Sequence, residues 1–346
     1  MDHRQSSKIL GSCYGFTRLW LKVIILLAII TLAPLSLRAE DRGDARTVYG
    51  ATHPSTFALY ALDPDLLGGW NTLLRAYEKK FIPEKYQSLP ILGGWYGAGY
   101  TPDPEVLISS GLKKALYLGG AAHDSMGITP VLEELGMEVI IIPSALSEMP
   151  ETFRALGQKF NRKERGEELA AYAEEVLGKL QTALGDLPED QKPKIYMALG
   201  EDGLESLCRR SDRSDSVVWA GGENIYDCPE QMANANLRLS IEEIMRLDPD
   251  VVLVFNADLA KIIEKDPGWS QIRAIREGRW RLVPRGPFSW LERPATYMRL
   301  LGMQWLANWL HPELYPLDVD LECRRFLKLF FGLEPSPQEL TDLLTR

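Results

Sequence analysis

Residues 161–185 read NRKERGEELAAYAEEVLGKLQTALG and carry one uninterrupted helical pattern. Apolar side chains recur at helical spacing through this otherwise charged segment. They are Leu169, Tyr172, Ala173, Val176, Leu177, Leu180 and Leu184. We expect Asn161 to cap the first turn, with Glu164 three residues later, and Gly185 to end the helix. A helix of this length spans about 35 Å, roughly the width of a small domain.

Alternating strand and helix signals lie on both sides of this helix. The predicted strands cover residues 46–52, 66–71, 91–94, 113–118 and 137–142 before it, and 194–199, 251–255 and 279–283 after it. Strands that alternate with helices favour mostly parallel sheets, so the sequence predicts an α/β protein with two lobes joined by a rigid helix. An ordinary crossover helix within one sheet has the same periodicity, and the pattern alone leaves both arrangements open.

The first 39 residues have the pattern of a secretory signal peptide. Basic residues precede the apolar run at 23–32, and Ala39 offers a small residue for cleavage before Glu40. The run is short for a membrane span, although an uncleaved anchor is the alternative. Because Cys13 precedes the apolar run, we expect an exported, soluble protein that is not a lipoprotein. The predicted segments are then the signal at 1–39, the N-terminal lobe at 40–160, the connecting helix at 161–185, and the C-terminal lobe with its terminal helices at 186–346.

Charge and cysteine usage narrow the classes of partner. The chain of 346 residues has a formal net charge of −9, which argues against a nucleic-acid partner but allows an anionic ligand in a locally basic cleft. In an exported protein, Cys208 and Cys228 close a short loop and are the predicted disulfide. Cys323 lies on an apolar helical pattern and is predicted to be a buried thiol. No spacing of cysteines or histidines matches a zinc motif, and no GxSxG, P-loop or HExxH motif indicates an enzyme.

Candidate ligand contacts follow the predicted strands, because ligands of open α/β sheets bind beyond the carboxyl ends of the strands. The first half contributes His53, Trp70, Asn71, Trp95, Tyr96, Tyr100, His123 and Asp124. The second half contributes Glu201, Asp202, Asn256, Asp258, Arg285, Phe288, Trp290, Glu292 and Arg293. Aromatic rings with arginines and carboxylates suit a bulky ligand that has flat surfaces and negative groups.

Several of these candidates have an equally good structural explanation. Trp70 and Trp95 are as well explained as plugs at the edge of a lobe. His53 stands at a strand-to-helix turn, where a histidine often only caps the backbone. His123 with Asp124 fits either a surface loop or a metal ligand with its orienting carboxylate. His53 and His123 are therefore the candidate metal ligands, and no metal site is certain.

The second half has the strongest single candidate. Three residues at 288–290, Phe-Ser-Trp, are hard to explain as solvated surface. Arg293 also has a structural explanation, because it can pair with Glu292 or Asp318. The strongly apolar segment at 294–310 is predicted to form a helix that begins at Pro294.

The chain resembles a known family, the periplasmic substrate-binding proteins of ABC importers. The proteins of this family carry ferric siderophores, haem and vitamin B12. The resemblance covers about residues 47–344, and its motifs are specific in their order and spacing. They are LPILGG at 89–94, PDPE at 102–105, AGGENI at 220–225, LSIEE at 239–243, DPDVVL at 248–253, Trp269 with AIREGR at 274–279, and FSWLERP at 288–294.

The resemblance implies two Rossmann-like α/β lobes joined by a single long α-helix, with a ligand cleft between them. It implies a monomeric periplasmic receptor without catalytic activity or cofactor, which delivers an iron-siderophore or similar metal chelate to a permease dimer in the inner membrane. Haem, cobalamin and nickel or cobalt complexes are alternative ligands, and an exported hydrolytic enzyme is the alternative of another class. By resemblance, Glu105 and Glu242 contact arginines of the permease.

Overall fold

The computed structural model describes residues 47–95, 101–119, 127–143, 145–229, 232 and 235–345. The predicted signal peptide lies outside these residues, as do Tyr96, Tyr100 and His123. Within the described ranges, no helix is long and apolar enough to cross a membrane.

The first half is built on a three-stranded parallel sheet in the order β1-β2-β3. Its strands are β1 (Val48–Gly50), β2 (Lys114–Leu118) and β3 (Glu138–Ile142). Its helices are α2 (His53–Leu62), α3 (Ala76–Lys79), α4 (Glu84–Gln87), α5 (Pro104–Ser109), α6 (Ile128–Glu134) and α7 (Met149–Lys159). The strand predicted at 66–71 is wrong: a 3-10 turn, η1 (Pro64–Leu66), opens this segment, and only isolated bridges from Leu67 and Trp70 follow.

The second half is built on a four-stranded parallel sheet in the order β6-β4-β8-β9, beside a two-stranded antiparallel ribbon, β5-β7. The strands are β4 (Lys194–Ala198), β5 (Glu205–Ser206), β6 (Glu223–Asn224), β7 (Leu237–Arg238), β8 (Val251–Val254) and β9 (Trp280–Leu282). The helices are α9 (Asp215–Trp219), α10 (Ile241–Leu247), α11 (Ala257–Ile262), α12 (Arg273–Arg276), α13 (Met298–Leu310), α14 (Val319–Phe331) and α15 (Pro337–Thr345), with the 3-10 turns η4 (Glu189–Gln191), η5 (Asp212–Ser214) and η7 (Trp269–Gln271).

Helix α13 begins at Met298 and not at Pro294 as predicted. The Thr296 hydroxyl accepts a hydrogen bond from the Met298 amide at 3.2 Å and holds the turn that precedes the helix. The residues before this turn are therefore free to form a loop after β9, and that loop carries several of the predicted ligand contacts.

The long helix α8 (Lys163–Leu184) forms as predicted, and all seven residues of its predicted apolar stripe are buried. The predicted cap at Asn161 is wrong. Asn161 adopts a left-handed conformation, with φ 54°, just beyond the end of α7. The Arg162 amide donates to the Gly157 carbonyl at 2.7 Å and the Asn161 amide to the Gln158 carbonyl at 3.5 Å, which is the hydrogen-bond pattern of a Schellman motif. Asn161 therefore ends one helix and does not begin the next.

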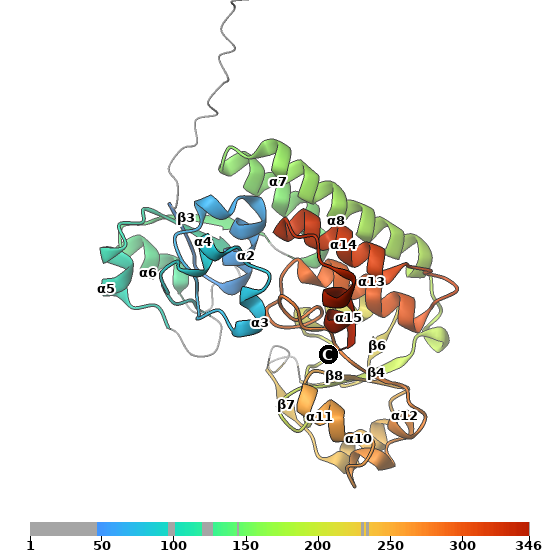
Figure 1. Cartoon of the computed structure of the whole chain (residues 1–346). Helices are drawn as coiled ribbons and strands as arrows, with labels where there is room; N and C mark the ends of the chain where they lie inside the picture. Colours follow the sequence, from blue (N-terminus) through green and yellow to red (C-terminus); the bar gives the residue numbers. More distant parts are fainter. Residues whose placement is uncertain are drawn as a thin grey trace, which may run out of the picture. The chain divides into compact units, whose positions relative to one another are not determined.

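This corner folds α8 back along α7, and the two helices lie side by side (Figure 1). Two glycines allow the close approach. A methyl group added at Gly166 would lie 2.7 Å from the Phe153 carbonyl oxygen and 2.8 Å from Cα of Gly157. Both distances are below ordinary van der Waals contact, so neither glycine can be replaced without moving a backbone. By contrast, Gly178 is exposed and has open space around its Cα.

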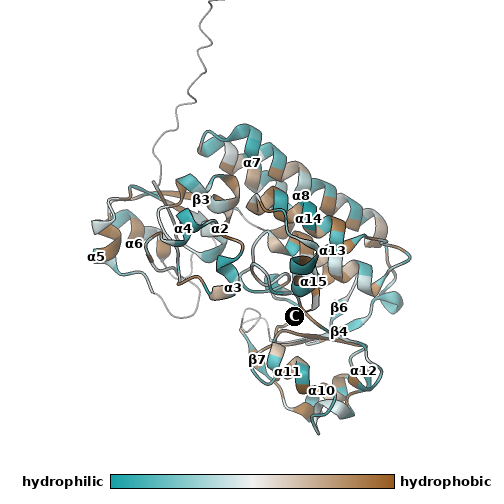
Figure 2. Ribbon diagram, in the orientation of Figure 1, coloured by the Kyte–Doolittle hydropathy of each residue, from teal (hydrophilic) through white to brown (hydrophobic). Residues whose placement is uncertain are grey.

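One hydrophobic core includes α8 and residues from both halves of the chain. The Phe57 ring on α2 lies 3.8 Å from the Phe288 ring, measured between centroids, and the Tyr60 ring lies 5.9 Å from Phe331 on α14. Figure 2 shows hydrophilic and hydrophobic residues alternating along α8, as expected for a helix with one buried stripe. The halves are therefore joined by packing as well as by α8.

A buried polar network reinforces the packing of α8 against α13 and α14. The Gln304 amide donates to the Tyr172 hydroxyl at 3.1 Å and to the Glu322 carboxylate at 3.2 Å. The Tyr315 hydroxyl donates to the Gln304 oxygen at 3.0 Å, and the Tyr172 hydroxyl donates to Glu322. Because each of these buried groups has a partner, the network holds the three helices in one register.

Replacing the helical glycines by alanine is expected to have opposite effects at the two positions. Gly166→Ala should lower the free energy of unfolding by about 1–3 kcal/mol, because the added methyl group meets the backbone of α7. Gly178→Ala, the matched control, should raise it by about 0.5–1 kcal/mol, because alanine is the better helix former where nothing is displaced. Urea denaturation measures both, and equal effects would contradict the close-packed corner.

The ion pair between Glu175 on α8 and Arg325 on α14 predicts a pH dependence of stability. A hydrogen bond from Arg325 is the main reason that the pKa of Glu175 falls to about 2. A lowered folded-state pKa contributes stability above the unfolded pKa of about 4.3, and this contribution is lost as the pH falls toward 2. Glu175→Gln should therefore be less stable than wild type at pH 6, with the difference closing near pH 2. Thermal melts at several pH values measure this, with Glu133→Gln, which removes an exposed glutamate that has no ion pair in the described residues, as the control.

Candidate ligand site

The loop at 285–293, between β9 and α13, is anchored by two of its aromatic residues. Trp290 is fully buried, and its indole N–H donates to the Gly286 carbonyl at 3.0 Å. Phe288 is 3% exposed and packs on Phe57 from the first half. The structure gives both rings a packing role in place of the predicted ligand contact. Their burial leaves Arg285 and Arg293 as the exposed residues of the loop.

Trp70 is likewise part of the core. It is 2% exposed, and its indole N–H donates to the Tyr86 carbonyl at 2.7 Å. Trp95 is half-buried, its amide donates to the Ala51 carbonyl at 3.0 Å, and its ring lies edge-on to Tyr49. Trp70 is therefore a plug of the lobe, which was the alternative explanation, whereas Trp95 keeps part of its surface exposed.

His53 is the first residue of α2 and is half-buried. Its Nε2 lies 3.5 Å from the Thr72 hydroxyl, and its ring centroid lies 6.2 Å from that of Phe57. Since Phe57 also contacts Phe288, His53 and the loop at 285–293 adjoin the same aromatic side chain. These contacts bring together one predicted residue of the first half and the predicted loop of the second.

A cluster of charged residues is centred on Glu292, whose side chain is only 8% exposed. Its carboxylate accepts a short hydrogen bond from Arg213, and Nε of Arg293 lies 3.3 Å from the same oxygen. The Asn236 oxygen accepts from Nη1 of Arg213 at 3.0 Å and from Nη2 of Arg293 at 3.5 Å. Two guanidinium groups therefore share a buried carboxylate and an amide oxygen. The alternative pairing of Arg293 with Glu292 is the one that forms.

The two arginines differ in accessibility. The Arg213 side chain is 12% exposed and that of Arg293 is 62% exposed. Burial, followed by repulsion from Arg293, lowers the pKa of Arg213 to about 10, so Arg213 remains cationic at neutral pH. Arg213 thus forms the inner part of the cluster, and Arg293 presents its guanidinium to solvent. An anion whose oxygen atoms accept hydrogen bonds is the ligand that such a pair recognises best.

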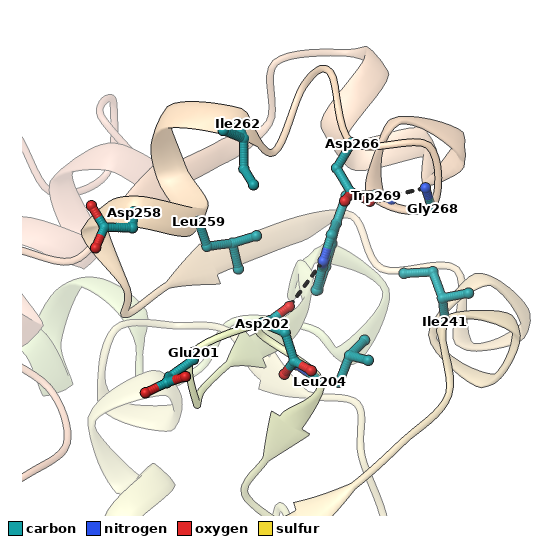
Figure 3. Close-up of a pocket in the computed structure, with 10 residues that line it drawn as sticks. All are labelled: Glu201, Asp202, Leu204, Ile241, Asp258, Leu259, Ile262, Asp266, Gly268 and Trp269. Carbon is teal, nitrogen blue, oxygen red and sulfur yellow. Dashed lines mark hydrogen bonds between the residues drawn. The ribbon is translucent and has the colours of Figure 1, made fainter.

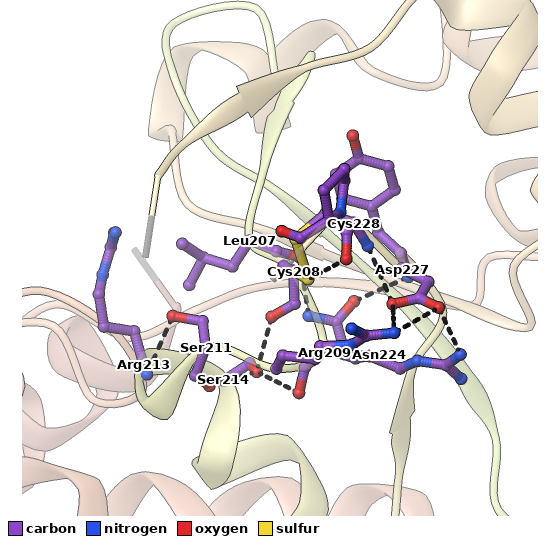
Figure 4. Close-up of a disulfide and its surroundings, with 12 residues drawn as sticks. Leu207, Cys208, Arg209, Ser211, Arg213, Ser214, Asn224, Asp227 and Cys228 are labelled. Atoms are coloured by element: carbon purple, nitrogen blue, oxygen red, sulfur yellow. Dashed lines mark hydrogen bonds and ion pairs between the residues drawn. A yellow bond between two sulfur atoms is a disulfide. The ribbon is translucent and has the colours of Figure 1, made fainter. Parts of the chain in front are cut away.

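The disulfide between Cys208 and Cys228 holds the segment that carries Arg213 (Figure 4). The Cα atoms of the two cysteines are 5.6 Å apart. The Ser214 hydroxyl donates to the Cys208 carbonyl at 3.1 Å, and the Arg213 amide donates to the Ser211 hydroxyl at 3.3 Å. Arg213 is therefore fixed to a covalently closed loop. Cys323 is a buried free thiol, as predicted.

Arg213 and Asn236 are not among the residues predicted from strand ends, because neither follows a predicted strand. Arg213 lies inside the disulfide loop, and Asn236 precedes the short strand β7. The available signal was the loop itself: a covalently closed segment that contains arginines is a place where a charged side chain can be held rigidly. The expectation that ligands bind beyond the carboxyl ends of strands identifies only residues that follow a predicted strand, so it does not identify these two.

A separate pocket of about 410 Å³ brings together other strand-end residues (Figure 3). Glu201 and Asp202 follow β4, and Asp258 lies in the first turn of α11. Trp269 closes one side, and its indole N–H donates to the Asp202 carbonyl at 3.0 Å. The carboxylates of this pocket disfavour an anionic ligand. In the described part of the chain, no group of three or more His, Cys, Asp or Glu side chains is arranged to hold a metal ion.

Glu105 and Glu242 stand near the starts of two short helices, α5 and α10, and both are exposed. The Asp103 carboxylate accepts from the Glu105 amide at 2.9 Å. On α10 the predicted capping box forms, with Ser240 and Glu243 each accepting from the other's amide. In the described residues, neither the Glu105 nor the Glu242 carboxylate has an ion-pair partner.

Comparison with known proteins agrees with this architecture. The family profile described as "Periplasmic binding protein" matches residues 116–285. An ABC transporter solute binding protein from Sulfurospirillum deleyianum has a similar structure, with a TM-score of 0.82 and 29% identity, over 88% of this chain and 95% of that one. The molybdate-binding protein MolA of Haemophilus influenzae is 29% identical over 171 residues, which are 48% of this chain and 46% of MolA.

A longer match joins this chain to the high-affinity heme uptake system protein IsdE of Staphylococcus aureus. The two are 23% identical over 282 residues, which cover 77% of this chain and 89% of IsdE. The match to MolA, in contrast, spans only about half the length of that relative. The matched profile, these relatives and the two parallel sheets agree, and the chain belongs to the periplasmic binding protein family of ABC importers, whose members are transport receptors and not enzymes.

Proposed function

We propose that this protein is the receptor of an ABC importer for an anionic metal chelate, with an iron-siderophore as the leading ligand. The observation that carries the proposal is the cluster of Arg213, Glu292 and Arg293, in which an exposed guanidinium is held beside a buried one. Arginine recognises carboxylate and other oxygen anions through paired hydrogen bonds, and Arg293 has donors to offer. Arg285 lies on the same loop and is also exposed.

The names of the relatives support this ligand class. MolA is named for molybdate and IsdE for heme uptake, and both ligands combine a metal with negatively charged oxygens. An anionic ferric chelate has the same combination. Trp95 supplies a partly exposed aromatic ring, and Tyr96, Tyr100 and His123, which lie outside the described residues, remain proposed contacts.

A nickel or cobalt complex, including a corrinoid, is the second candidate. His53 favours it, because its imidazole is half-buried and adjoins Phe57, which packs against the anchored loop. An imidazole in that position is a suitable ligand for a metal with an open coordination site. His53→Ala would then abolish binding of Ni-histidine while leaving binding of a coordinatively saturated ferric chelate unchanged.

We place permease docking at Glu105 and Glu242. Both carboxylates are exposed on short helices and lack ion pairs in the described structure, so they are available to cations of another protein. The partner is a permease in the inner membrane whose cytoplasmic subunits hydrolyse ATP. The receptor itself acts as an exported monomer after removal of residues 1–39.

The ligand proposal is tested by titrating intrinsic tryptophan fluorescence with ferric siderophores, haem, cobalamin and Ni-histidine. Arg293→Gln should weaken the binding of the anionic chelate that quenches wild type by about tenfold or more, since a charge-assisted hydrogen bond contributes about 1.5–3 kcal/mol. Arg276→Gln is the control, because Arg276 is an exposed arginine whose guanidinium, among the described residues, donates to the Gln271 carbonyl. Equal affinity of Arg293→Gln and wild type would remove Arg293 from the site.

The docking proposal is tested in proteoliposomes that contain the permease and its ATPase subunits. The double variant Glu105→Ala/Glu242→Ala should bind ligand like wild type, but should need about tenfold or more receptor for half-maximal ATPase stimulation, because two interfacial ion pairs are lost. The matched control is Glu133→Ala/Glu313→Ala, which removes two other exposed glutamates. Stimulation indistinguishable from this control would exclude the two glutamates from the interface.

A further inference from the structure

The two helices that carry Glu105 and Glu242 occupy equivalent places in the two sheets. In the first sheet β2 lies between β1 and β3, and α5 is the helix that precedes β2. In the second sheet β8 lies between β4 and β9, and α10 is the helix that precedes β8. The strand order β1-β2-β3 therefore corresponds to β4-β8-β9. The halves share no evident sequence repeat, so a feature common to α5 and α10 is not a trivial copy.

Such a common feature exists on the exposed faces of these helices. Glu105 and Glu242 each stand at the second helical position, and an exposed apolar side chain follows three residues later in both cases. Ile108 is 61% exposed and Met245 is 39% exposed. Residues three apart are neighbours on a helix surface, so each glutamate lies beside an apolar group. Each helix thus presents the same pair, one carboxylate and one large apolar side chain.

These apolar residues are not needed to hold the helices in place. Leu107 and Ile244 are fully buried and attach α5 and α10 to their lobes. A single exposed apolar residue is common on any protein surface and has no meaning by itself. Here the apolar residue lies beside a glutamate that has no ion pair in the described residues, and this arrangement recurs on two topologically equivalent helices. The recurrence points to a common partner.

We propose that Ile108 and Met245 are the apolar contacts of the permease interface, each beside its glutamate. The partner would be a permease of two like subunits, each presenting an arginine or lysine next to an apolar recess. Each glutamate requires a cation on the partner, and each neighbouring apolar side chain requires an apolar surface there. Because the pair is present on two helices, the partner must present a cation and an apolar surface at two places. This inference rests on the proposed function and adds the apolar half of the docking surface to it.

The test uses the ligand-loaded receptor with its permease and ATPase subunits in proteoliposomes. Ile108→Ser/Met245→Ser should raise the receptor concentration for half-maximal ATPase stimulation by about tenfold, as expected for the loss of two buried apolar contacts. The matched control is Val131→Ser/Leu321→Ser, which removes two apolar residues that are 39% and 64% exposed on α6 and α14. Ligand affinity, measured by tryptophan fluorescence, should be unchanged in both variants.

The dependence on salt concentration distinguishes the contribution of the glutamates from that of the apolar residues. Stimulation by wild type and by Ile108→Ser/Met245→Ser should weaken with increasing sodium chloride to a similar degree, because both keep the glutamates, whereas Glu105→Ala/Glu242→Ala should lose most of this dependence. If wild type stimulates ATP hydrolysis and Ile108→Ser/Met245→Ser matches its control, the inference is overturned and the proposed function stands. If wild type itself gives no stimulation, the proposed function fails as well.

Discussion

The close approach of two backbones at Gly157 and Gly166 is the constraint on which the rest of the structure depends. Because no side chain separates α7 from α8 at this point, the corner after α7 turns tightly, and the direction of α8 is fixed by a helix of the first half. The stripe of α8 is then placed where α13 and α14 can cover it. The helix that links the two lobes therefore also packs against residues of both lobes.

This packing has consequences for the ligand site. The loop at 285–293 belongs to the second half by sequence, but its Phe288 ring packs on Phe57 of the first half. The buried Trp290 anchors the loop through the Gly286 carbonyl, and Arg213 lies in the segment that the disulfide closes. The charged cluster is therefore presented by a preorganised surface, and large hinge motion would have to break aromatic contacts in the shared core.

The sequence predicts those parts of the fold that depend on local patterns. The stripe of α8, the capping box at Ser240 and the strand at 251–255 all rest on spacing or on a local hydrogen bond, and all are confirmed. The error at Asn161 arose because the same residue type caps a helix start and tolerates the left-handed conformation after a helix end. Only the neighbouring helix decides between the two.

The site was less predictable for a similar reason. Trp70 and Trp290 were expected to contact ligand, but each indole N–H found a nearby backbone carbonyl, so both rings could be buried. Arg213 joins the charged cluster through its contact with Glu292, which lies 79 positions away in sequence. Hydrophobic periodicity and the positions of strand ends do not predict such contacts, because the contacts arise from tertiary packing.

In the proposed ligand site, the buried Glu292 would make the binding of an anion an exchange of one carboxylate for another. Arg293 already has the Glu292 carboxylate beside it, so in the proposed binding mode a ligand carboxylate would replace part of that interaction. The net gain on binding is therefore smaller than for a bare guanidinium, and when the ligand leaves, Glu292 is already in place to neutralise the charge. A receptor that must surrender its cargo to another protein benefits from such a built-in substitute, because release does not strand an uncompensated cation.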